Sequence, residues 1–296
     1  MKDNTKKRFI TGAILFVVFA SVIMLTLKVH WVFFDILIFL LALMAAYEIC
    51  NAIRQKYPAP MRVFVYSAIV LGYVAYIIAQ RVFDIGIGGI TMYFAVLLVL
   101  SMTMIIFSLC SKKATTNNVI ATMFVFLYPV SALLYTLGIN HFEPHIRAVG
   151  ILLLFTVSTF TDMFAYFVGS TVKGKKLCPK ISPNKTVSGA IGGLLGGIAA
   201  GAIWYFVSLT ELGAFLGMAP LLGGSSLEWL AYLSVGLFGS LATQFGDLFA
   251  SYVKRLVGIK DYSHLLPGHG GIMDRIDGLM FNGVILYFAL AVISIL

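Results

Sequence analysis

Residues 251–277 read SYVKRLVGIKDYSHLLPGHGGIMDRID and interrupt a chain that is otherwise strongly apolar. Apolar residues make up 60% of the 296-residue sequence and charged residues only 11%. This stretch nevertheless holds Lys254, Arg255, Lys260, Asp261, Asp274, Arg275 and Asp277. Charges at that density between two apolar segments are costly unless they face water, a metal or a charged substrate. The stretch therefore indicates a functional polar region held between membrane-spanning helices.

The apolar segments around this stretch predict the fold class. A mean hydropathy of +0.97 is typical of a polytopic membrane protein. Taking about 20 apolar residues per crossing, we expect an all-α integral membrane protein with about nine transmembrane helices. They are predicted at 9–28, 31–51, 62–80, 90–109, 119–138, 148–169, 188–208, 229–250 and 279–296.

The basic residues predict the orientation of these helices. With the N-terminus in the cytoplasm, 18 of the 21 Lys and Arg residues fall in cytoplasmic connections, as the positive-inside rule requires. We divide the chain into N-terminal transmembrane helices, 1–147, with about five spans, and a C-terminal catalytic region, 148–296. Both polar loops of the catalytic region, 170–187 and 251–278, then lie on the cytoplasmic side.

The charge balance and the cysteines exclude other classes of protein. The formal net charge of +9 fits cytoplasmic loops beside anionic lipid, so we expect no nucleic acid partner. Cys50, Cys110 and Cys178 form no CxxC pair, which argues against a disulfide framework or a zinc site.

The stretch at 251–277 resembles the C-terminal signature of the phosphatidate cytidylyltransferases, also called CDP-diacylglycerol synthases. The signature is a Ser, then Lys-Arg, Lys-Asp, His-Gly-Gly, and Asp-Arg with a closing Asp. The matching residues are Ser251, Lys254, Arg255, Lys260, Asp261, Ser263, Leu266, Pro267, His269, Gly270, Gly271, Ile272, Asp274, Arg275, Ile276 and Asp277. The resemblance covers at least 160–296. It implies transfer of CMP from CTP to phosphatidic acid, giving CDP-diacylglycerol and pyrophosphate in a step of phospholipid biosynthesis.

Three carboxylates are candidate metal ligands. Asp247, Ser251 and Lys254 are spaced by four and three residues, so they share one face of a helix. Asp274 and Asp277 are three residues apart at the start of the next helix. Mg²⁺ prefers oxygen ligands and needs few from protein when phosphates supply the rest. With the resemblance giving most of the weight, we expect Asp247, Asp274 and Asp277 to bind Mg²⁺, with room for a second cation. The alternative is pairing with nearby Lys and Arg.

A second polar segment, 173–186, is a candidate phosphate site. Ser182, Lys185 and Thr186 come just before a predicted Gly-rich helix, where free amides and the helix dipole attract phosphate. The segment is similar to the family's Ser-Pro-x-Lys-Thr motif, although Ser188 stands where the family pattern suggests an acid. The alternative is a basic loop that faces lipid headgroups.

The candidate site residues fall into a catalytic set and a substrate-binding set. The predicted catalytic residues are Asp247, Lys254, Arg255, Lys260, Asp261, His269, Asp274, Arg275 and Asp277. The predicted substrate-binding residues are Ser182, Lys185, Thr186, Ser251, Gly270, Gly271 and Asp162. Basic members would hold the triphosphate and stabilise the leaving pyrophosphate, and an acid at a span end is a functional candidate by default. The role of His269, in substrate binding or in holding its loop, is left open.

The helix predicted at 188–208 has glycines at 189, 193, 197 and 201 along one face. This spacing favours tight packing inside the bundle, with a dimer seam or a substrate contact as alternatives. We expect a homodimer in a bacterial inner membrane, with the active site on the cytoplasmic face.

Two rival functions are weaker fits to the sequence. A CDP-alcohol phosphotransferase would need an Asp-Gly-x-x-Ala-Arg motif, but Asp277-Gly278 continues as Leu-Met-Phe-Asn. A secondary transporter would use Asp162 and Asp247 as coupling acids near the bilayer midplane, whereas the acids are predicted at one membrane face.

Overall fold

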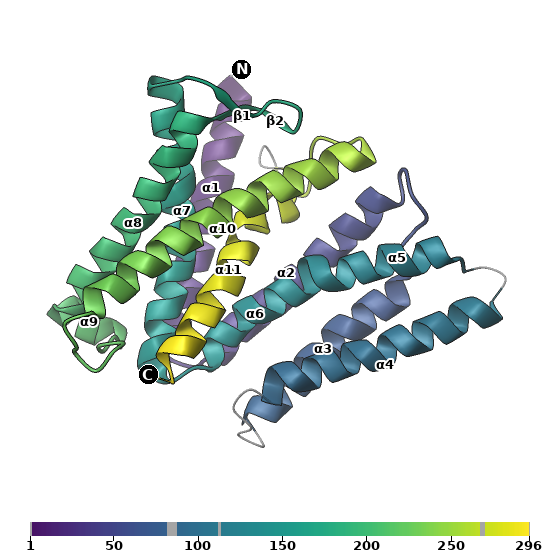
Figure 1. Cartoon of the computed structure of the whole chain (residues 1–296), viewed down its shortest axis with the longest axis horizontal. Helices are drawn as coiled ribbons and strands as arrows, with labels where there is room; N and C mark the ends of the chain where they lie inside the picture. The colour runs from purple at the N-terminus through teal and green to yellow at the C-terminus, as the bar shows by residue number, and fades with distance from the viewer. Residues whose placement is uncertain (1, 82–87, 112–113, 267–269, 296) are drawn as a thin grey trace.

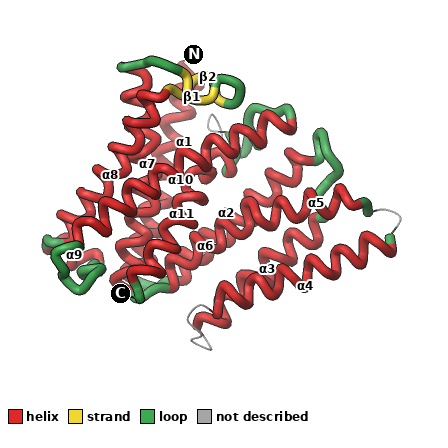
Figure 2. The backbone as a smooth tube through the Cα atoms, viewed as in Figure 1, coloured by secondary structure: helices red, strands yellow, loops and turns green. Residues whose placement is uncertain are grey.

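The computed structural model describes the whole chain except residues 1, 82–87, 112–113, 267–269 and 296. The described residues form a helical bundle with one small two-stranded sheet (Figure 1, Figure 2). The N-terminal elements are α1 Lys2–Lys28, α2 Val32–Ile53, α3 Arg62–Arg81, α4 Gly88–Cys110, α5 Thr116–Val125, η1 Phe126–Ser131, α6 Ala132–Gly138 and η2 Ile139–His141. The remaining elements are α7 Pro144–Thr171, β1 Lys176–Cys178, β2 Ser182–Thr186, α8 Val187–Ser208, α9 Glu211–Leu216, α10 Glu228–Val257 and α11 Met273–Ile293.

The structure confirms an all-α polytopic membrane architecture. Within the described ranges, eight helices are long and apolar enough to cross a membrane. They overlap eight of the predicted spans, and the ninth prediction, 229–250, lies in α10, which is outside this set of eight. The count of nine spans and the cytoplasmic N-terminus therefore stay predictions.

The predicted span at 119–138 is interrupted. Helix α5 ends at Val125, and Tyr128 has an extended backbone with φ −139° and ψ 112° before α6 begins at Ala132. Pro129 lacks the amide that a continuous helix needs, which explains a break at this point. The predicted span is therefore kinked, and the whole segment Thr116–His141 is still long and apolar enough to cross a membrane.

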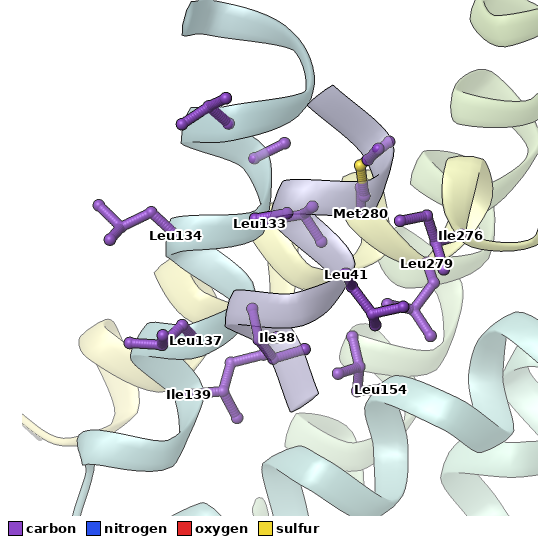
Figure 3. Close-up of a cluster of buried hydrophobic side chains, with 14 of the residues drawn as sticks. Ile38, Leu41, Leu133, Leu134, Leu137, Ile139, Leu154, Ile276, Leu279 and Met280 are labelled. Carbon is purple, nitrogen blue, oxygen red and sulfur yellow. The ribbon is translucent and has the colours of Figure 1, made fainter. Parts of the chain in front are cut away.

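Helix α2 lies at the centre of the bundle and joins its two halves. Figure 3 shows Ile38 and Leu41 of α2 beside residues of α6, α7 and α11, among them Leu133, Leu154 and Met280. All of these side chains are buried. The regions divided at 147 therefore share one hydrophobic core, and α2 contacts the helix that carries Asp274 and Asp277.

The glycine face of α8 packs inside the bundle, as predicted. A Cβ atom on Gly189 would lie 2.8 Å from Ala165 O of α7, and one on Gly197 would lie 2.5 Å from Gly236 O of α10. Neither position has room for a side chain, because real Cβ contacts are longer than 3 Å. The backbones of α7 and α10 can thus approach α8 closely, which brings together the elements that surround the candidate site.

Candidate active site

A cavity of about 430 Å³ opens between α7, the β1–β2 hairpin, α8 and α10. The hairpin pairs Lys176 with Thr186 and Cys178 with Ser182 in antiparallel register. The cavity is lined by Asp162, Ala165, Tyr166, Gly169, Ser170, Leu177, Asn184, Lys185, Thr186, Gly189, Ala190, Gln244 and Asp247. Four of the predicted site residues, from three separate segments, therefore line one cavity: Asp162, Lys185, Thr186 and Asp247.

An ion pair crosses this cavity from the hairpin to α10. Lys185 Nζ lies 2.5 Å from Asp247 Oδ2, and both side chains are partly exposed, at 28% and 35%. A pair this accessible contributes little to stability. Both groups are consequently open to a ligand that carries phosphate or a cation.

Thr186 is the last residue of β2 and immediately precedes α8. Its Oγ1 accepts a hydrogen bond from Gly189 N at 3.1 Å, so Thr186 is the N-cap of this helix. Ser188, at the position where the family pattern suggests an acid, donates from Oγ to Lys173 O. Ser188 thus ties the start of α8 to the segment before the hairpin, and the predicted phosphate contact of Thr186 stays a prediction.

Two glycines place Asp247 beside Asp277. A Cβ on Gly246 would lie 2.5 Å from Asp277 O, and one on Gly278 would lie 2.8 Å from Thr243 Cγ2. Helices α10 and α11 therefore cross backbone to backbone at the level of the two acids. Asp277 is only 9% exposed, and its Oδ1 accepts a hydrogen bond from Gly278 N at 2.8 Å.

The buried carboxylate of Asp277 belongs to a larger charge cluster. It interacts electrostatically with Asp247, Asp162 and Lys254. Asp162 interacts in turn with Asp247, Lys185 and Arg275. Three acids and three basic side chains from α7, the hairpin, α10 and α11 thus act on one another at one end of the bundle.

Asp274 holds the loop that connects α10 to α11. Its Oδ1 accepts a 2.6 Å charged hydrogen bond from Lys254 Nζ, and the two side chains are 4% and 12% exposed. Its Oδ2 accepts hydrogen bonds from Tyr262 N at 2.9 Å and Gly271 N at 3.0 Å. Burial raises the pKa of the Tyr262 phenol, which donates to Ala250 O. Asp274 is therefore fully engaged within the protein.

The other predicted residues that the structure describes are not among those that line the cavity. Arg255 donates to Ile181 O of the hairpin and to Ile259 O, at 3.4 and 3.3 Å, and so joins the end of α10 to the hairpin. Lys260, Asp261 and Arg275 are exposed. Partly buried residues are Ser182, Ser251 and Gly270, whereas Gly271 is buried. His269 lies outside the described residues.

The carboxylates of the site can be compared with the coordination that Mg²⁺ prefers. Among the residues that the structure describes, no three His, Cys, Asp or Glu side chains are grouped as a metal site. Mg²⁺ does not require such a cage, because it is usually bound by one or two carboxylates together with substrate phosphates. Asp247 and Asp277 fit that mode, whereas Asp274 already accepts three hydrogen bonds.

Several polar residues near the site were not predicted from the sequence. Tyr166, Asn184 and Gln244 line the cavity. Glu48 of α2 accepts hydrogen bonds from Ile272 N and Met273 N at the start of α11. An acid near the end of a predicted span is a signal that would have found Glu48.

Comparison with known proteins identifies the family of this chain. Similar curated proteins named phosphatidate cytidylyltransferase come from Brucella abortus, 44% identical over 137 residues (46% of this chain, 45% of the relative), and from Helicobacter pylori, 36% identical over 167 residues (55% of each). A protein of that name from Bacillus subtilis is 40% identical over 134 residues, 45% of this chain and 44% of the relative. The chain thus spans about half the length of these relatives. The model of the cytidylyltransferase family matches residues 6–293, and the chain belongs to that family.

Proposed function

We propose that this chain is a phosphatidate cytidylyltransferase, which transfers CMP from CTP to phosphatidic acid and forms CDP-diacylglycerol and pyrophosphate. The observation that carries the proposal is the cavity lined by Lys185 and Asp247, beside the buried Asp277, at one end of an apolar bundle. Family membership and the names of the relatives support it. Such a site suits a reaction between a water-soluble triphosphate and a lipid phosphate.

In this reaction a phosphate oxygen of phosphatidic acid attacks the α-phosphorus of CTP. The bond between the α-phosphorus and the bridging oxygen breaks, and pyrophosphate leaves with that oxygen. The chain needs no nucleophile of its own, because the lipid phosphate is the nucleophile. Lys185 and the exposed Arg275 would bind the triphosphate and stabilise the leaving group, since fixed positive charges lower the energy of the transition state.

Magnesium would neutralise the phosphates and orient them for in-line displacement. Asp247 and Asp277 are the residues proposed to hold it, and Asp274 is proposed to position the loop. The partial exposure of Asp247 leaves its carboxylate accessible from the cavity.

Labelled CTP tests the proposal. The purified protein, given phosphatidic acid and Mg²⁺, should move label from [α-³²P]CTP into the lipid phase, while label from [γ-³²P]CTP should appear in pyrophosphate. A CDP-alcohol phosphotransferase would not consume CTP, and a transporter would form no product. Absence of α-label in the lipid, or its appearance without phosphatidic acid, would contradict the proposal.

The proposed orientation places the site at the cytoplasmic face of a bacterial inner membrane, in a homodimer. In Figure 1 the β1–β2 hairpin lies at the same end as the N-terminus, and the C-terminus lies at the opposite end. Bacterial relatives support the choice of membrane.

Single cysteines at the two ends of α7 test this orientation. Glu143, which precedes α7, and Lys180, in the hairpin, are both exposed. In a variant that lacks Cys110 and Cys178, Lys180→Cys should react with an impermeant maleimide only from the cytoplasmic side, and Glu143→Cys only from outside. The opposite pattern would invert the topology, and labelling of both from one side would show that α7 does not cross.

A further inference from the structure

Glu48 links the N-terminal half of the chain to the catalytic segment. It lies on α2, is 2% exposed and has no role in the sequence predictions. Its Oε1 accepts hydrogen bonds from Ser263 Oγ at 2.5 Å and from Ile272 N at 3.0 Å. Its Oε2 accepts a hydrogen bond from Met273 N at 2.8 Å. One buried carboxylate therefore binds both the α10–α11 loop and the beginning of α11.

These contacts satisfy a specific need of the helix. The first N–H groups of a helix have no partner within it, and a carboxylate there also complements the helix dipole. Ile272 is the N-cap of α11 and Met273 its first residue. The amide of Gly271, which precedes Ile272, donates a hydrogen bond to Asp274 Oδ2. Two carboxylates from different helices, Glu48 of α2 and Asp274 of α11, thus accept hydrogen bonds from three successive backbone amides, those of residues 271–273.

Glu48 also explains one glycine of the His-Gly-Gly sequence. A Cβ on Gly271 would lie 2.5 Å from Glu48 Oε2 and 2.8 Å from Oε1. Any side chain at 271 would push the carboxylate away from the amides of Ile272 and Met273. The glycine therefore makes room for a carboxylate that comes from α2.

We propose that Glu48 is a positioning residue for nucleotidyl transfer, which fixes the start of α11 so that Asp277 stays beside Asp247. This inference rests on the proposed function. Asp277 follows Met273 by four residues, about 6 Å along the helix, so a shift of the helix start moves Asp277 with it. A displacement of about 1 Å at reacting groups lowers a rate by about 10²-fold.

The test compares Glu48→Gln with a matched variant of the same helix, Asp35→Asn. Asp35 is also buried, at 4% exposed, and its carboxylate contacts Asn140 Nδ2 at 2.7 Å and His141 Nε2 at 3.0 Å. It lies 13 residues from Glu48, about 20 Å along α2. Both variants remove one buried charge from α2, but only the first removes an acceptor from α11.

The two variants should differ in turnover. We expect Glu48→Gln to lower kcat about 10²-fold, with the KM for CTP changed less than about twofold. Asp35→Asn should keep kcat per folded molecule within about twofold of the original, whatever its thermal stability. Glu48→Asp keeps the charge but shortens the side chain by one methylene, and its kcat should be about tenfold lower than that of the original. Equal losses in the Gln and Asn variants, or an unchanged kcat in Glu48→Gln, would overturn the proposal.

Hydrogen exchange separates this inference from the proposed reaction. Peptides covering 270–280 should exchange at least about tenfold faster in Glu48→Gln than in the original, and at the original rate in Asp35→Asn. If the unmodified protein transfers no nucleotide but this exchange pattern holds, the reaction is wrong and the anchoring by Glu48 stands. If exchange at 270–280 is the same in all proteins, the anchoring is wrong even where the transfer assay succeeds.

Discussion

Asp277→Asn is expected to lower nucleotidyl transfer by at least about 10³-fold, because it removes one of the two carboxylates proposed to hold magnesium, at the crossing of α10 and α11. The folded protein should not be weakened. Asp277 is 9% exposed and lies in the field of Asp247 and Asp162, so a neutral side chain relieves like-charge repulsion and a desolvation cost. The Oδ1 of asparagine can still accept the hydrogen bond from Gly278 N.

Initial rates with labelled CTP and thermal unfolding in the same detergent measure the two effects. The expected combination is lost activity with an unchanged or higher midpoint of unfolding. Asp274→Asn is the matched control, because it neutralises the other acid of the Asp-Arg-x-Asp sequence. It should lower the midpoint, since it leaves Lys254 without its partner. Activity within tenfold of the original in Asp277→Asn would rule out a direct role for this carboxylate.

Lys254→Met is expected to destabilise the protein by about 3–5 kcal/mol, the usual effect of removing one partner of a buried ion pair. The pair with Asp274 qualifies as buried, because the side chains are 12% and 4% exposed. The uncompensated Asp274 carboxylate would still have its two amide donors, Tyr262 N and Gly271 N, but no counter-charge. The free energy of unfolding in detergent, measured by denaturant titration, gives the magnitude.

A double variant tells pairing apart from catalysis. Lys254→Met combined with Asp274→Asn leaves no unpaired charge, and the asparagine oxygen can still accept from Tyr262 N and Gly271 N, so most of the lost stability should return. Activity should stay about 10²-fold low, because Lys254 also acts on Asp277 at the site. Recovery of both stability and activity in the double variant would show that Lys254 serves only to neutralise Asp274.

Much of this site could be predicted from the sequence because its chemistry is locally encoded. Charged residues in an apolar chain are conspicuous, and helical spacing alone places Asp247, Ser251 and Lys254 on one face. The glycine periodicity of α8 likewise predicted the close packing that the structure shows. These inferences needed only neighbours within a few turns of helix.

Contacts between distant segments were not predictable in the same way. Asp274 and Asp277 are both acids and lie three residues apart, yet one binds the loop and the other interacts electrostatically with Asp247. The role of each acid depends on how α10 and α11 cross at Gly246 and Gly278. That crossing is a tertiary property, which helical spacing does not reveal. The partners of Glu48 could not be predicted for the same reason, because they follow it by more than 200 residues.

That separation affects the order in which the protein is made. Met273 follows Glu48 by 225 positions, and at about 5–20 residues per second a ribosome needs about 11–45 s to add them. During that interval α2 has already been synthesised, but the amides that bind its carboxylate do not yet exist. The candidate site therefore cannot form until late in biosynthesis, when the start of α11 has been made. A chain that stops before α11 carries a buried acid on α2 without its partners.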